Sequence, residues 1–265
     1  MSAVAHTATR RYSKPRSKTI RRFRRKLRIA WCCILAIAAF LAVNWIYQTI
    51  RKPAELLGPI SSSFAKSPQA TWESYGPLFN KYSTPVVSAE LLAALAQVEG
   101  NGNPVALTYW RWKWSWYPWE IYRPASTALG MFQLTDGTFA EARKYCIRDH
   151  QVLAEGSWYD PRSCWLNRFY SRNIPSHAVE MAAAYLHTNV AVILRDRLDK
   201  TTAEQKDRLA TVIHLCGVKH ARRFAEGGFR IIETEHCGTH NVRMYVSRVN
   251  AMKDRFHRLR EADVS

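Results

Sequence analysis

One carboxylate in this chain is placed where it could do acid–base chemistry. Glu99 follows the apolar run LLAALAQV (91–98) and precedes the loop GNGNP (100–104). A carboxylate at the C-terminal end of a helix opposes the helix dipole, so helix stability does not explain this residue. A carboxyl group held against apolar neighbours keeps its proton more readily and can give it to a leaving oxygen. Glu99 is therefore a candidate general acid, and the alternative is a glutamate solvated at a helix end.

A second unusual segment is YWRWKWSWYPWE (109–120), which contains five of the ten tryptophans. As far as residue 116, tryptophans alternate with Arg111, Lys113 and Ser115. A period of two places the rings on one face of a strand and the cations on the other, so we predict a short β-arm. Two interpretations remain open. Either the rings pack on a helical core, or some of them, with Trp112 and Trp114 as candidates, stack on a flat ligand.

The residues on either side of this arm resemble a known family. EGNGNPVAL (99–107) and STALGMFQLTDGTFAEA (126–142) resemble the lytic transglycosylase domain of the soluble type, which shares a fold with goose-type lysozyme. Glu99, NPVA (103–106) and GMFQ (130–133) are the counterparts of the family motif. NIPSHAVEMAAAYL (173–186) resembles the family's long helix with its Tyr-Leu pair, here Tyr185 and Leu186. The resemblance covers about residues 88–227.

The resemblance implies a peptidoglycan substrate. Glu99 would protonate the glycosidic oxygen between N-acetylmuramic acid and N-acetylglucosamine. It would then take the proton of the muramic C6 hydroxyl, which attacks C1 and leaves a 1,6-anhydro sugar. One carboxylate suffices because no water is activated, unlike in most glycosidases. We expect no cofactor and no metal.

The resemblance also implies a set of substrate-binding residues. Met131, Phe132 and Gln133 would line the cleft beside Glu99, and Ser126 and Tyr185 match family positions near it. His214 stands where the family has a tyrosine that supports the catalytic carboxylate, and Gly100 replaces the family's serine. Structural alternatives remain open, since Gln133 could satisfy backbone groups, Ser126 could be a turn residue and His214 could belong to the core.

Two further functions stay open. A hydrolytic muramidase would need a second carboxylate to activate water, and Glu120, Asp136 and Asp160 are the candidates. The second alternative function is a membrane-anchored, non-catalytic scaffold that binds peptidoglycan in an envelope complex. It stays open because Gly100 and His214 depart from the family pattern. Digestion products would separate these functions.

The positive charge of the chain lies mostly at its N-terminus. The net charge is +18, and residues 1–28 contain eleven Lys/Arg and no acidic residue. Residues 29–50 carry no charge, which fits one transmembrane helix with the basic tail in the cytoplasm and residues 51–265 in the periplasm. A cleaved signal peptide, a twin-arginine signal and a nucleic-acid-binding tail are weaker alternatives. Because this segment is a dedicated anchor, we expect the arm itself not to insert into a membrane, and we expect no nucleic-acid partner.

Four of the six cysteines lie in the exported part, where disulfides form. Cys146–Cys164 and Cys216–Cys237 are the predicted pairs, because each closes a short loop. Zinc is the alternative for these cysteines, but no CxxC is present and the nearby histidines lack regular ligand spacing.

The remaining pattern is mainly α-helical. A stalk with one short helix is expected over residues 51–69, and a lysozyme-like domain with a short β-arm over residues 70–265. Apolar periodicity and capping residues predict the helices. Their expected ranges are 88–100, 135–148, 176–198, 201–217, 218–226 and 240–259, with Ser88, Ser176 and a Thr201/Glu204 capping box at three of the starts.

Overall fold

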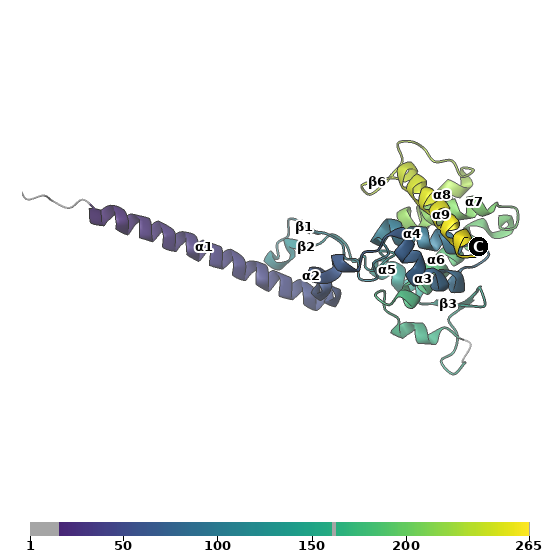
Figure 1. The fold of residues 1–265 in the computed structure, drawn as a ribbon, viewed down its shortest axis with the longest axis horizontal. Helices are drawn as coiled ribbons and strands as arrows, with labels where there is room; N and C mark the ends of the chain where they lie inside the picture. The colour runs from purple at the N-terminus through teal and green to yellow at the C-terminus, as the bar shows by residue number, and fades with distance from the viewer. Residues whose placement is uncertain (1–15, 161–162, 265) are drawn as a thin grey trace, which may run out of the picture.

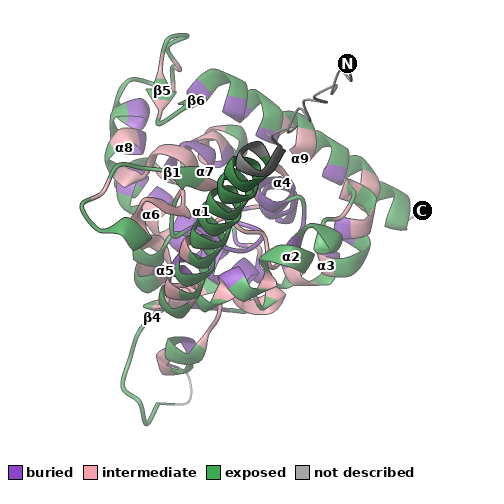
Figure 2. Cartoon of the chain, turned by 90° about the vertical axis from the view of Figure 1, so that its left-hand side faces the viewer, coloured by how far each residue is buried: buried purple, intermediate pink, exposed green. Residues whose placement is uncertain are grey.

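The N-terminal helix α1 (Arg16–Arg51) projects from the rest of the chain in the computed structural model, which describes residues 16–160 and 163–264 (Figure 1). Its surface is exposed along most of its length (Figure 2). Among the described residues, Ile20–Arg51 is the one helix long and apolar enough to cross a membrane, and an 18-residue window within it has a mean hydropathy of 2.3. A signal sequence meets the same criteria. Residues 1–15 of the predicted basic tail lie outside the described residues.

The segment predicted to be a stalk packs against the globular domain. It forms three short helical turns, η1 (Pro53–Leu57), α2 (Gly58–Ser61) and η2 (Ser62–Phe64). The Ser61 hydroxyl donates to the Val105 carbonyl (2.8 Å), and the Asn103 side-chain amide donates to the Ser61 carbonyl (2.7 Å). These bonds join the segment to the loop that follows Glu99, so this part of the chain belongs to the wall of the domain.

Helices form the core, which confirms the mainly α, lysozyme-like class. Helix α4 (Ala89–Gly100) is buried at nearly every position, and α9 (Val242–Val264) packs along it. Figure 1 shows α4, α6 and α9 gathered at the centre of the domain. Helix α6 spans Pro175–Leu194, and the helices around this centre are α3 (Pro68–Tyr82), α5 (Asp136–Ala142), α7 (Ala203–Cys216) and α8 (Val218–Glu226), with the short turns η4 (Trp165–Phe169) and η5 (Arg195–Arg197).

The predicted helix starts are confirmed in part. Ser88 caps α4 by accepting from the Leu91 amide. The capping box of α7 lies one residue later than predicted, with Thr202 and Gln205 exchanging side chain–backbone hydrogen bonds. The predicted Ser176 cap is wrong, because Pro175 occupies the first turn of α6 and places Ser176 inside the helix. Helix α3 was not predicted.

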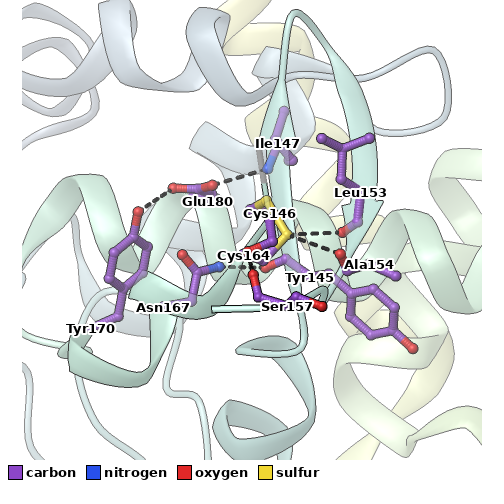
Figure 3. Close-up of a disulfide and its surroundings, with 11 residues drawn as sticks. Tyr145, Cys146, Ile147, Leu153, Ala154, Ser157, Cys164, Asn167, Tyr170 and Glu180 are labelled. Carbon is purple, nitrogen blue, oxygen red and sulfur yellow. Dashed lines mark hydrogen bonds between the residues drawn. A yellow bond between two sulfur atoms is a disulfide. The ribbon is translucent and has the colours of Figure 1, made fainter. Parts of the chain in front are cut away.

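The helix predicted over residues 135–148 ends after its first half. Strand β3 (Tyr145–Arg148) follows α5 and pairs antiparallel with β4 (Gln151–Ala154). The buried Glu180 of α6 accepts from the Ile147 amide (2.9 Å) and the Tyr170 hydroxyl (3.0 Å), as Figure 3 shows. A buried carboxylate needs such donors, so this tertiary contact outweighs the local helical pattern.

Both predicted disulfides are present. Cys146 in β3 is bonded to Cys164 (Figure 3), and Cys216 at the end of α7 is bonded to Cys237. Cys237 lies in the two-residue strand β5 (His236–Cys237), which pairs with β6 (His240–Asn241). The bonds span sequence separations of 18 and 21 residues, and loops of that length correspond to roughly 3 kcal/mol of stabilisation each.

The tryptophan-rich segment forms the predicted arm. Strand β1 (Trp110–Trp112) pairs antiparallel with β2 (Tyr122–Pro124), and the turn η3 (Pro118–Glu120) lies between them. Trp112, Trp114 and Trp116 are 65%, 82% and 89% exposed. The interpretation that these rings pack on the helical core is therefore wrong.

Candidate active site

Glu99 lies in the last turn of α4, at the edge of an open cavity of about 580 Å³. Asn101 ends the helix in the left-handed conformation (φ 50°), so the chain turns sharply after Glu99. The cavity wall combines the end of α4, the loop that follows it, the segment between α1 and α3, and the arm. Its lining residues are Glu55, Gly58, Ser61, Ser62, Ala65, Glu99, Gly100, Asn101, Asn103, Ala106, Leu107, Thr108, Trp110 and Gln133.

Two groups from distant helices contact the Glu99 carboxylate. The Tyr245 hydroxyl of α9 donates a hydrogen bond to Glu99 Oε1. His214 Nε2 of α7 lies 3.8 Å from the same oxygen, which is too long for a hydrogen bond. Among the residues that the structure describes, these contacts fall on Oε1. In the described part of the chain, Oε2 takes part in no hydrogen bond or ion pair.

Both neighbours of Glu99 are buried, and burial shifts their pKa values in ways that keep them neutral. Burial and the Glu99 charge raise the pKa of the Tyr245 phenol well above its ordinary value, so Tyr245 remains a hydrogen-bond donor. Burial lowers the pKa of His214, and the Glu99 charge and the Phe132 backbone only partly oppose this effect. His214 thus lies beside Glu99, but the hydrogen bond to the carboxylate comes from Tyr245.

Gly100 is required by a close backbone approach. A Cβ atom at residue 100 would lie 2.7 Å from Met131 Cα and 2.8 Å from the Met131 carbonyl oxygen. Contacts below 3.0 Å against backbone atoms cannot be relieved by a side-chain rotation. The departure from the family's serine is therefore a packing requirement of this chain.

We expect Gly100→Ser to destabilise the domain by about 1–3 kcal/mol, the usual cost of overpacking a tight site. Thermal unfolding by circular dichroism measures this effect. Gly137→Ala is the matched control, because no atom lies within 4 Å of the added Cβ and alanine favours a helix. Equal melting temperatures for Gly100→Ser and the original chain would contradict the packing argument.

Gln133 lies between the Glu99 cavity and a second cavity. It adopts a positive φ of 46°, and its side-chain amide donates to the carbonyls of Ala106 (3.1 Å) and Gly130 (2.9 Å). The second cavity has a volume of about 220 Å³. Its lining residues are Gln133, Leu134, Thr135, Thr138, Tyr185, Ile213, His214, Leu215 and Gly217. Gln133 lines both cavities, which together form one candidate groove beside Glu99.

Residues 77–203 match the family model described as the transglycosylase SLT domain. This chain carries a transglycosylase SLT domain. The match supports membership of a lytic transglycosylase family and includes Glu99 and Gln133, whereas His214 and Tyr245 lie beyond it. No curated protein and no solved structure matches the chain.

Several residues predicted to bind substrate lie away from the groove of the SLT domain. Met131 and Phe132 are 0% and 1% exposed and belong to the hydrophobic core. The Ser126 hydroxyl accepts from the Ala128 amide in a turn, and Ser126 lines a separate cavity next to Arg51 and Lys52. In the described part of the chain, Trp112 and Trp114 line neither cavity at Glu99.

The Glu99 cavity of the SLT domain contains a second carboxylate, which the sequence did not predict. Glu55 of η1 is 1% exposed and lines the cavity. Trp110 Nε1 donates to its Oε2 (2.9 Å), and Lys52 Nζ lies 3.0 Å from its Oε1. Lys52 therefore offsets the charge of Glu55, and Trp110 donates to its other oxygen. The predicted candidates Glu120, Asp136 and Asp160 are not among the lining residues, and Glu120 pairs with Arg51 (2.8 Å).

One group of possible metal ligands is present in the described residues. In residues 16–160 and 163–264, the atoms of Cys216, His220 and Cys237 lie within 4.8 Å of one another. The two sulfurs are bonded to each other in a disulfide. Zinc binds thiolates, so this group does not match the zinc alternative.

Acid should destabilise the SLT domain through partly buried histidines. Burial lowers the pKa values of His177, His187 and His214 below the ordinary 6.5. Between the lowered pKa and 6.5, the unfolded chain binds more protons than the folded one, so the stability present above pH 6.5 is lost as the pH falls. Urea unfolding at pH 7.5 and 5.5 should show a lower free energy of unfolding at pH 5.5, and a smaller difference for His187→Gln. An equal free energy of unfolding at the two pH values would contradict the lowered pKa values of these histidines.

Proposed function

We propose that the chain is a peptidoglycan lytic transglycosylase that cleaves the bond between N-acetylmuramic acid and N-acetylglucosamine and leaves 1,6-anhydro ends. One observation carries the proposal: the SLT domain cavity is lined by the Glu99 carboxyl group, only one oxygen of which is held by neighbouring residues, while both oxygens of Glu55 are held by Lys52 and Trp110. This arrangement suits a reaction that needs one acid–base group. A hydrolytic mechanism needs a second group to activate water.

The proposed reaction uses Glu99 twice. Tyr245 holds Oε1, and the proton on Oε2 is transferred to the glycosidic oxygen as the bond to C1 breaks. The resulting carboxylate then takes the proton of the C6 hydroxyl, whose oxygen forms the new bond to C1. Glu99 is protonated again at the end, and no water is consumed. The neutral His214 borders the carboxylate without competing for its proton.

The glycan strand is proposed to run along the two cavities that meet at Gln133. Trp110 is partly exposed and lines the larger cavity, and its ring nitrogen donates to Glu55 (2.9 Å). Tyr185 borders the smaller one. Aromatic faces and amide side chains suit sugar rings and their acetamido groups, so Trp110, Gln133 and Tyr185 are the proposed glycan contacts.

The proposed location is the cytoplasmic (inner) membrane, with α1 as a single-pass anchor, the N-terminus in the cytoplasm and the SLT domain in the periplasm. The eleven basic residues before residue 29 support this orientation. The two disulfides support an oxidising compartment for the domain.

Analysis of digestion products tests the proposal. Purified protein is incubated with isolated peptidoglycan sacculi, and the released muropeptides are analysed by mass spectrometry. Products with 1,6-anhydro ends support the proposal, whereas reducing ends would establish a hydrolytic muramidase. Binding to sacculi without any release would favour the non-catalytic scaffold.

A further inference from the structure

The arm is attached to the last turns of α1. We refer to residues 109–124 as the tryptophan hairpin. The side-chain amides of Asn44 and Gln48 both donate to the Trp119 carbonyl, at 2.8 and 2.9 Å, and the Tyr47 and Trp119 rings lie 6.0 Å apart. Arg51 forms an ion pair with Glu120 (2.8 Å). Figure 1 shows β1 and β2 beside the end of α1 nearest the domain.

These contacts explain two polar residues in the apolar helix. Asn44 and Gln48 are 1% and 6% exposed, whereas most of α1 is exposed (Figure 2). An amide N–H group that faces lipid without a partner is costly, so the hairpin stabilises both side chains by accepting from their NH2 groups near the end of the span. The hairpin is thus fixed to α1 at a defined level.

That level coincides with the edge of a bilayer. A hydrocarbon core of about 30 Å is crossed by about 20 helical residues at 1.5 Å each. Counted from Ile29, the first residue after the basic tail, the span ends near Gln48. The hairpin is therefore level with the membrane–water interface, where tryptophan and tyrosine concentrate in membrane proteins.

The outer surface of the hairpin has the composition of an interfacial segment. Trp112, Trp114, Trp116 and Tyr117 are between 60% and 89% exposed, far more than large aromatic rings in a soluble core. Arg111 and Lys113 alternate with them and are exposed as well. Contiguous exposed rings mark an interaction surface, and neighbouring cations suit the phosphates of anionic lipids.

We propose that the tryptophan hairpin is a second, interfacial membrane contact, in which its exposed rings insert at the headgroup level and its cations face lipid phosphates. The proposal rests on α1 being the transmembrane anchor. It replaces the expectation that the arm stays out of the membrane, because the structure places the arm against the anchor. Trp110 of the hairpin also lines the Glu99 cavity, so the contact would hold the groove at a fixed height and orientation above the bilayer.

Fluorine NMR on the full-length protein tests this contact. The chain is labelled with 5-fluorotryptophan and placed in nanodiscs of phosphatidylethanolamine and phosphatidylglycerol, with or without a headgroup spin label. Single Trp→Phe substitutions assign the signals. Trp158, which is 72% exposed in the loop after β4, is the control, because Figure 1 shows this loop away from α1.

We expect the Trp112, Trp114 and Trp116 signals to lose most of their intensity with the spin label, while Trp158 keeps its intensity. Unchanged hairpin signals would overturn the proposal. A spin label on the acyl chains tests the anchor separately, with Trp31 of α1 (59% exposed) as the reporter. If the Trp31 signal were unchanged, α1 would not be in the membrane and the proposal would lose its basis. The proposed catalysis would be unaffected. Shifts of the hairpin signals on adding soluble glycan fragments, without any lipid effect, would assign the rings to substrate instead.

Discussion

Glu99→Gln should reduce the release of anhydro-muropeptides by roughly 10²–10⁴-fold, the usual contribution of a general acid–base group. Glutamine keeps the shape of the side chain and can still accept a hydrogen bond from Tyr245, but it has no proton to give to the glycosidic oxygen. The measurement is the initial rate of release from purified sacculi, with products identified by mass spectrometry.

Two controls make this result specific. The melting temperature of Glu99→Gln should stay close to that of the original protein, because the carboxylate is partly exposed at the cavity. Glu73→Gln, an exposed change on α3, should keep full activity. If Glu99→Gln released muropeptides at the original rate, the catalytic role of Glu99 would be wrong.

Tyr245→Phe is expected to reduce the rate by about 10- to 100-fold while leaving the fold intact. A hydrogen bond to a charged group contributes about 1.5–3 kcal/mol, and each 1.36 kcal/mol corresponds to a factor of ten in rate. Without the hydroxyl, Glu99 Oε1 loses its donor and the carboxyl group is free to rotate. The ring remains buried, so packing between α9 and α4 is preserved.

Tyr170→Phe is the matched control, since it also removes a tyrosine hydroxyl from a carboxylate, that of Glu180. It should lower the melting temperature and leave the rate per folded molecule unchanged. A positioning role for Tyr245 predicts the opposite pattern, with a reduced turnover number and little change in substrate affinity. If both variants lost only stability, Tyr245 would be a packing residue.

Local sequence patterns identified Glu99 as a candidate and predicted the helix that carries it. A capping serine, an apolar run and a glycine-rich loop are all short-range signals. Tyr245 gives no such signal. It occupies one apolar position among several on the last helix and meets Glu99 from 146 residues away. Contacts of this length are fixed by how the helices pack, which periodicity does not specify.

The errors in secondary structure have a similar origin. The predicted helix over residues 135–148 contains a strand because the Cys146–Cys164 bond and the buried Glu180 hold residues 145–148 extended. The alternation of tryptophans predicted the arm correctly as a strand. It did not specify what the two faces would meet, because that depends on Asn44 and Gln48, about 70 residues earlier in the chain.

Glu55 and the residues after it connect the lining of the Glu99 cavity to α1. The residues that close one side of the Glu99 cavity, Glu55, Gly58, Ser61 and Ser62, follow α1 directly and precede the first helix of the domain. Proteolysis between them and α3 would release a fragment that keeps Glu99 and Tyr245 but lacks this side of the cavity. If the chain has the proposed activity, we expect such a fragment to be inactive, so that peptidoglycan cleavage would require the domain to stay attached to α1.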